Sequence, residues 1–167
     1  MNDSFELILG GERLSVEAGT SFLELAKKEQ GKYPSPILLA TLNGVLHELG
    51  STVEEAGELR FLTLRDKAGF QSYERSAVLL LLAAQYSLYG KTGREIWIDY
   101  KESGALRCRI LGQNRVSREE LARLEAAMRE LVAAALPIEK RSVPTREAVR
   151  LFAARGMKDK AELFRFR

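Results

Sequence analysis

Residues 37–49 read Ile-Leu-Leu-Ala-Thr-Leu-Asn-Gly-Val-Leu-His-Glu-Leu, and this stretch decides the fold of the first part of the chain. Asn43-Gly44 separates two apolar runs and is the strongest short hairpin signal present, because both residue types tolerate positive φ. Working outward, Phe5–Leu9 and the residues around Leu14 and Val16 flank Gly10-Gly11 as a second predicted hairpin. The stretch Leu59–Leu64 alternates in the manner of a last strand.

A helix is predicted between the two hairpins. Ser21-Phe22-Leu23-Glu24 has the form of a capping box, in which the serine and glutamate side chains satisfy each other's backbone N–H groups. Leu25 and Ala26 extend the apolar face that begins at Phe22. The resulting order ββαβββ in about sixty residues predicts a β-grasp, a small ubiquitin-like sheet folded over one helix.

The second part of the chain has the pattern of an α+β domain. Ser72 is expected to cap a helix from Tyr73 to about Leu88. Its run Ala77–Ala84 is apolar on all sides, so the helix is expected to be buried, within one core or between two modules. Two predicted strands and further amphipathic helices follow. We therefore expect an α+β protein with a domain at residues 1–66, a linker at 67–72 and a second domain at 73–167.

Composition narrows the functional classes. The 167 residues include one cysteine and one histidine, which excludes an internal disulfide framework and argues against a Cys/His metal site. Residues 1–66 hold 6 Lys and Arg against 11 Asp and Glu, whereas residues 67–167 hold 20 against 12, so an acidic part precedes a basic one. The longest apolar run is Ala77–Ala84, far short of the roughly 20 residues that span a membrane. No basic and apolar leader opens the chain, and we expect a cytoplasmic protein with no membrane contact.

The first part resembles a TGS domain, the β-grasp module at the front of threonyl-tRNA synthetases. The resemblance rests on Gly10-Gly11, on Glu17-Ala18-Gly19-Thr20 before the helix, and on Asn43-Gly44 followed by Leu49. The second part resembles the editing-type domain that follows in those synthetases and also occurs with alanyl enzymes. In chain order, the motifs that carry this resemblance are Ser117-x-x-Glu120-Leu121, Glu125-x-x-Met128-x-x-Leu131, Pro137-Ile138, Glu147-Ala148-x-x-Leu151-Phe152, Gly156 and Lys160-Ala161-Glu162-Leu163.

One departure from that family bears on chemistry. The editing-type domain carries His-x-x-x-His on its first helix, where two imidazoles one turn apart can bind a metal or position water. The matching residues here are Arg75 and Leu79. Leucine neither ligates a metal nor moves a proton, so we expect no editing hydrolysis, no bound cofactor and no catalytic residue in this chain.

The segment Asp66-x-x-Gly69-x-x-x-Tyr73-x-Arg75-Ser76 is similar to the front of a bacterial family of uridine kinase-like nucleoside kinases. Those proteins place TGS-like and editing-like regions before a P-loop kinase domain. No Gly-x-x-x-x-Gly-Lys-Ser/Thr loop occurs here. The resemblance therefore implies a non-catalytic N-terminal regulatory or ligand-sensing region, with a C-terminal P-loop domain in cis as partner and ATP with magnesium serving that absent domain.

Two functional hypotheses follow, each with an unremarkable alternative. Tyr73, Arg75 and Ser76 are candidates to hold a nucleotide, although Arg75 also suits a salt bridge at a domain junction. In the second hypothesis the chain is an RNA-binding module that recognises tRNA-like structure, and the candidate phosphate contacts are Arg107, Arg109, Arg115 and Arg118. A solvated strand face is the alternative for these arginines.

Three further residues, of types that often occur in functional sites, are not expected to be catalytic or to bind a ligand. Cys108 alternates with apolar neighbours and is expected to be buried. Trp97 is expected to serve in packing, and His47 to lie at the surface or on an edge strand.

Overall fold

The computed structural model describes residues 4–90, 95–102, 104–112, 115–136 and 138–166. The described strands and helices, in chain order, are β1 (Ser4–Leu9), β2 (Glu12–Glu17), α1 (Phe22–Glu29), η1 (Gln30–Lys32), β3 (Ile37–Leu42), β4 (Val45–Glu48), β5 (Gly57–Thr63), α2 (Lys67–Tyr89), β6 (Ile96–Glu102), β7 (Ala105–Ile110), α3 (Arg118–Ala133), α4 (Thr145–Ala154), α5 (Lys158–Leu163) and η3 (Phe164–Phe166). The chain divides into two compact units, residues 1–78 and 79–167.

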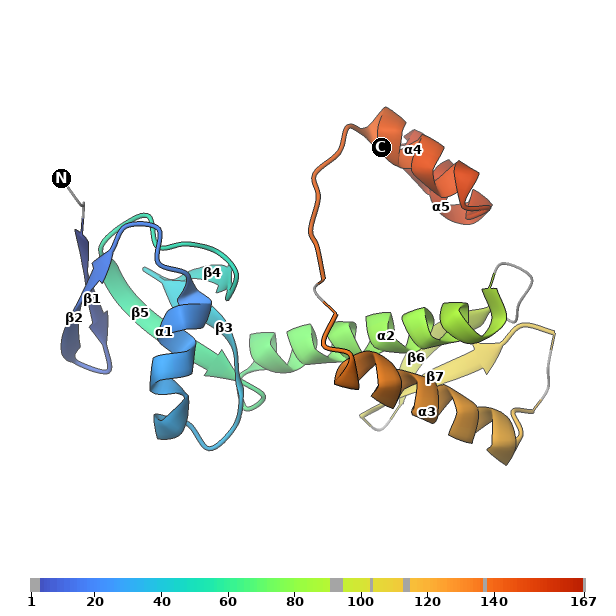
Figure 1. The fold of residues 1–167 in the computed structure, drawn as a ribbon, viewed down its shortest axis with the longest axis horizontal. Helices are drawn as coiled ribbons and strands as arrows, with labels where there is room; N and C mark the ends of the chain where they lie inside the picture. The colour runs from blue at the N-terminus through green and yellow to red at the C-terminus, as the bar shows by residue number, and fades with distance from the viewer. Residues whose placement is uncertain (1–3, 91–94, 103, 113–114, 137, 167) are drawn as a thin grey trace. The chain divides into compact units, whose positions relative to one another are not determined.

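The first unit is a β-grasp, as predicted. Its five strands lie in the order β2-β1-β5-β3-β4, with β1 and β5 parallel and the other neighbours antiparallel. Figure 1 shows α1 lying across one face of this sheet. Phe22 from the helix is fully buried in one core cluster with the strand residues Leu7, Leu42 and Leu59, so the helix supplies a large aromatic side chain to the core. The α+β fold class is confirmed.

The local signals that define this unit form as expected. Ser21 accepts a hydrogen bond from the Glu24 N–H, and the Glu24 carboxylate accepts one from the Ser21 N–H, so the capping box is complete. Asn43 adopts φ 51° at the hairpin turn. Its side-chain oxygen accepts from the Glu58 N–H at 2.9 Å and its NH₂ donates to the Ala56 carbonyl at 3.1 Å. Asn43 therefore also fastens the β3–β4 turn to the start of β5.

The junction between β5 and α2 differs from the prediction. The Asp66 carboxylate accepts from the Thr63 N–H at 2.9 Å and pairs with Arg60 at 2.7 Å, and the helix starts at the next residue. The carbonyl of Ser72 accepts a hydrogen bond from the Ser76 hydroxyl one turn later, so Ser72 lies inside the helix and is not its cap. Residues 67–72, the predicted linker, are thus helical. The predicted domain borders stay a prediction, because α2 continues through residue 78.

Gly69 makes this early start possible. A Cβ at position 69 would lie 2.1 Å from the Thr63 carbonyl oxygen, which is much shorter than the distances that real Cβ atoms keep from other heavy atoms. The first turn of α2 therefore packs directly on the backbone at the end of β5, at a distance that only glycine permits.

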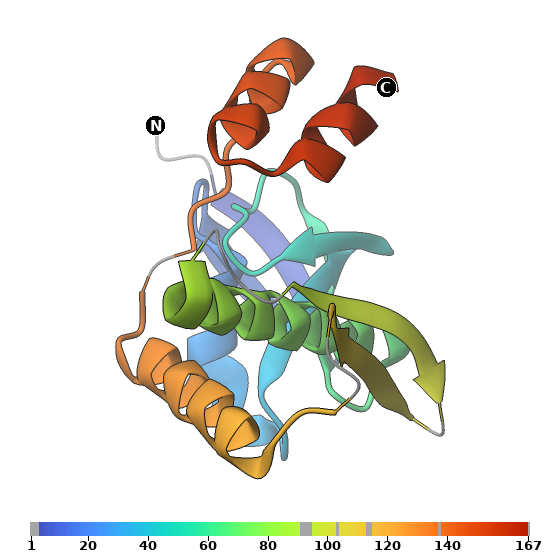
Figure 2. The same cartoon turned by 90° about the vertical axis from the view of Figure 1, so that its right-hand side faces the viewer.

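The second unit contains the hairpin β6–β7 and helices α3 to α5. β6, β7 and α3 lie beside the later part of α2 in both views (Figures 1 and 2). The Ser117–Glu120 capping box of α3 is complete. Farther along the chain, α4 and α5 form a helical hairpin in which the Phe152 and Phe164 rings stack at 5.5 Å between centroids. Pro137, part of one family motif, lies outside the described residues.

Burial in the second unit is lower than the sequence pattern predicts. In the run Ala77–Ala84 only Ala84 is buried, and Leu79 exposes 51% of its surface. The prediction of an all-round buried helix was therefore wrong. Eight consecutive apolar residues wind through two turns and face every direction, while neighbouring elements cover only part of that circumference.

Two residues of the β6–β7 hairpin are also more exposed than predicted. Cys108 is exposed, and Trp97 exposes 52% of its surface. The alternation of β7 places Cys108 on the same face as Leu106 and Ile110, but burial on that face is complete only at Ile110. Alternation along a strand shows on which face of the hairpin a residue lies. It does not show how many residues of that face are covered by other parts of the protein.

Replacing Gly69 with alanine tests the junction. We expect Gly69→Ala to lower the free energy of unfolding of the first unit by roughly 1–3 kcal/mol, because the added methyl group forces the Thr63 backbone and α2 apart. The matched control is Gly31→Ala, where a Cβ meets no atom within 4 Å. Urea unfolding followed by circular dichroism compares the two, and equal midpoints would contradict the close approach.

The reactivity of Cys108 tests its surroundings. Partial desolvation and then the Asp99 carboxylate raise the pKa of the Cys108 thiol. Since the thiolate is the reactive form, the pH profile of its alkylation should have a higher midpoint in the folded protein than in urea. The chain has one cysteine, so the rate reports this site alone. A folded midpoint at or below the unfolded one would contradict this environment.

Candidate nucleic-acid interface

The β6–β7 hairpin brings an aromatic ring and arginines to one exposed face. Trp97 pairs with Arg109 across the two strands, and Ile98 pairs with Cys108. Arg107 lies two residues before Arg109 on β7, and side chains alternate along a strand, so both arginines share the face of Trp97. Ile110 is buried on the opposite face. The hairpin therefore has one face toward the protein interior and one that carries Trp97, Arg107 and Arg109.

The position of Arg109 is fixed by a carboxylate. Asp99 accepts two hydrogen bonds from its guanidinium, at 2.5 Å from Nε and at 2.8 Å from the terminal nitrogen. These bonds hold the pKa of Asp99 below its usual value. Asp99 lies in the irregular stretch of β6 between Ile98 and Lys101, where the register with β7 shifts. The pair orients the arginine and offsets part of its positive charge.

The remaining predicted RNA contacts lie beyond this hairpin. Arg115 is exposed in the segment before α3, and Arg118 is exposed as the first residue of α3. The structure therefore places two of the four predicted arginines on one strand face and two after the strand has ended.

The residues predicted to hold a nucleotide are spread around α2. Tyr73 and Arg75 are exposed, and the Ser76 hydroxyl donates to the Ser72 carbonyl. Two residues apart on a helix correspond to a rotation of about 200°, so Tyr73 and Arg75 point to opposite sides. Leu79, one turn after Arg75, is exposed as well. The nucleotide-binding role of Tyr73, Arg75 and Ser76 stays a prediction.

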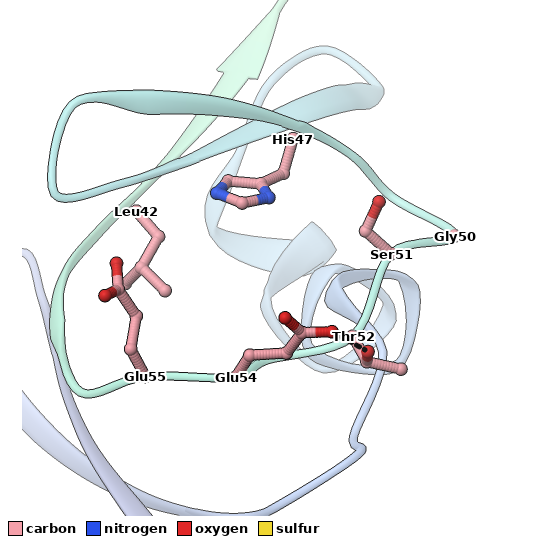
Figure 3. Close-up of a pocket in the computed structure, with 7 residues that line it drawn as sticks. All are labelled: Leu42, His47, Gly50, Ser51, Thr52, Glu54 and Glu55. Carbon is pink, nitrogen blue, oxygen red and sulfur yellow. Dashed lines mark hydrogen bonds between the residues drawn. The ribbon is translucent and has the colours of Figure 1, made fainter.

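A half-open pocket of about 610 Å³ lies in the first unit, and sequence reasoning missed it. Its lining residues are Leu42, His47, Gly50, Ser51, Thr52, Glu54 and Glu55 (Figure 3). Figure 3 shows the carboxylates of Glu54 and Glu55 on the opposite side from the imidazole of His47. The His47 ring contacts Phe22 at 4.9 Å between centroids and lies on the edge strand β4, as predicted. Two carboxylates make this pocket unfavourable for phosphate.

Neither a metal centre nor a membrane-spanning helix occurs among the residues that the structure describes. In the part of the chain that the structure describes, no group of three or more His, Cys, Asp or Glu side chains could hold a metal ion. Among the same residues, no helix combines the length and the apolar character needed to cross a membrane.

Comparison with known proteins adds an independent finding. No family model matches the chain. It is similar to the threonine–tRNA ligase of Carboxydothermus hydrogenoformans, with 30% identity over 84% of this chain and 22% of that protein. The corresponding enzyme of Methylococcus capsulatus shares 28% identity over 92% of this chain and 24% of its own length, and that of Rubrobacter xylanophilus shares 29% over 85% and 22%.

The chain thus spans less than a quarter of the length of the curated relatives it matches. An alignment over 153 of the 167 residues necessarily includes most of both units. These findings support the predicted resemblance to the N-terminal region of threonyl-tRNA synthetases. They give no support to a uridine kinase-like parent.

Proposed function

We propose that this chain is an RNA-binding module that recognises tRNA-like structure and performs no chemistry of its own. The observation that carries the proposal is the exposed hairpin face on which Arg107 and Arg109 lie beside Trp97. Arginine attracts RNA phosphates through charge and through its planar set of donors. The similarity of both units to proteins named threonine–tRNA ligase supports a tRNA-related role.

The distribution of charge favours the second unit as the binding region. The excess of basic residues lies in positions 67–167, and the excess of acidic residues lies in positions 1–66. A phosphate backbone approaching the acidic pocket would meet Glu54 and Glu55. The same backbone approaching β7 would meet Arg107 and Arg109, whose combined charge the single Asp99 carboxylate offsets only in part. We infer that RNA contacts the β6–β7 hairpin and not the pocket.

The proposed lack of chemistry is supported by the residues that the resemblance places at the family's histidine positions. Arg75 and Leu79 stand where the editing-type domain has two imidazoles, and both are exposed on α2. Neither side chain activates water at neutral pH.

A regulatory region of a nucleoside kinase, with a kinase domain in cis and ATP with magnesium bound there, was the main expectation from the sequence. The curated relatives named above are all ligases, and Tyr73 and Arg75 point to opposite sides of α2. No observation on this chain favours that reading over RNA binding.

Fluorescence anisotropy with a labelled tRNA-sized RNA tests the proposal. We expect the double variant Arg107→Ala/Arg109→Ala to bind at least tenfold more weakly than the unmodified chain. Each lost phosphate contact should also reduce the slope of log affinity against log salt by about 1, measured between roughly 50 and 200 mM salt.

The matched control is Arg13→Ala/Arg65→Ala, which removes the same charge from exposed positions of the acidic unit. The control should bind as the unmodified chain does. Equal losses in the two double variants would show a response to net charge alone, and no RNA binding by the unmodified chain would contradict the function. Circular dichroism checks that the hairpin variant is folded.

A further inference from the structure

Trp97 has an environment that packing does not explain. It exposes 52% of its surface on the outer face of a two-stranded hairpin. Its indole N–H donates to the Glu95 carboxylate at 3.4 Å, so the polar edge of the ring already has a partner within the strand segment. A half-exposed tryptophan can offer an aromatic face to a ligand.

The neighbour of Trp97 supplies the second half of a nucleotide site. Arg109 is its direct cross-strand partner, and the side chains of such a pair lie close enough to contact the same ligand group. The guanidinium donates two hydrogen bonds to the Asp99 carboxylate, which orient it before any ligand arrives. A fixed arginine loses less conformational entropy on binding than a mobile one. An aromatic face and an oriented cation therefore stand side by side.

We propose that Trp97 stacks on an unpaired base while Arg109 contacts the adjoining phosphate, so that the hairpin binds single-stranded RNA in preference to duplex. This inference rests on the proposed RNA-binding function. Bases in an A-form duplex are stacked on one another and their faces are closed to a side chain, whereas unpaired bases can be splayed onto an aromatic ring. Stacking of this kind tolerates any base, because every base has a π-face.

The combination of an exposed indole ring and an oriented guanidinium favours single-stranded RNA as the ligand. A peptide strand or an apolar protein surface supplies no phosphate to the oriented Arg109 cation, and an apolar surface would also bury the Arg109–Asp99 pair. A single-stranded RNA satisfies the ring with a base and the guanidinium with a phosphate.

The test uses the fluorescence of Trp97, which is the only tryptophan in the chain. Two ligands of equal length, about ten nucleotides of single-stranded RNA and the matching duplex, are titrated against the full chain. We expect the single strand to quench Trp97 and to bind more tightly than the duplex. Affinities of the variants are measured separately by anisotropy of labelled RNA.

We expect Trp97→Ala to weaken binding of the single strand about tenfold, within the range that loss of one stacked base produces. Its salt dependence and its affinity for duplex should not change, because no phosphate contact is removed. Trp97→Phe should retain most of the binding. The matched control is Tyr86→Ala, which removes an aromatic ring that is 47% exposed on α2. This control should leave binding unchanged.

The failure of this inference can be told apart from that of the proposed function. If Trp97→Ala binds the single strand as well as the unmodified chain does, while Arg107→Ala/Arg109→Ala loses binding, stacking is refuted and RNA binding stands. If duplex binds as tightly as single strand, or if Tyr86→Ala loses as much as Trp97→Ala, the stacking site is also refuted. If the unmodified chain binds neither RNA, both proposals fail.

Discussion

The carboxylate of Asp66 is the constraint on which the connection between sheet and long helix depends. It accepts the Thr63 N–H, pairs with Arg60 on the same strand and immediately precedes α2. The Asp66 side chain thus binds the end of β5 at the position where α2 begins. Gly69 completes the junction, because its missing Cβ lets the first helical turn approach the Thr63 carbonyl. The chain that follows, including the β6–β7 hairpin, continues from a helix whose start is set at this place.

The two units differ in how much apolar surface they bury and in which side chains they expose. The first unit has a well-filled core around Phe22 and an electronegative pocket, and its surface is predominantly acidic. The second unit buries fewer apolar side chains and presents its aromatic and basic groups to solvent. A half-exposed tryptophan forgoes burial that packing could otherwise supply, and such departures are typical of binding surfaces. We propose that recognition lies on the β6–β7 hairpin of the second unit, while the first unit holds the larger buried core.

The sequence predicts those features that local chemistry determines. The Asn43-Gly44 turn, the two serine–glutamate capping boxes and the ββαβββ order all follow from short motifs and are present. The start of α2 was misplaced because serine and aspartate are equally good capping residues, and only the contacts of Asp66 with β5 decide between them. The burial of Cys108 and Trp97 was overestimated. Alternation along a strand shows which face a residue lies on, but not whether other parts of the protein cover that face. Arg107 and Arg109 were predictable as a pair on one strand face, whereas the Asp99 contact depends on a register shift that no local pattern announces.

The central claim is that RNA contacts the β6–β7 hairpin. A two-dimensional amide NMR titration with single-stranded RNA tests it most directly, because every residue other than proline reports separately. The account predicts that the largest shift changes occur in residues 96–110 and in the Trp97 indole N–H, while the resonances of His47, Glu54 and Glu55 around the acidic pocket stay in place. Changes centred on that pocket, or spectra that RNA leaves unaltered, would contradict it.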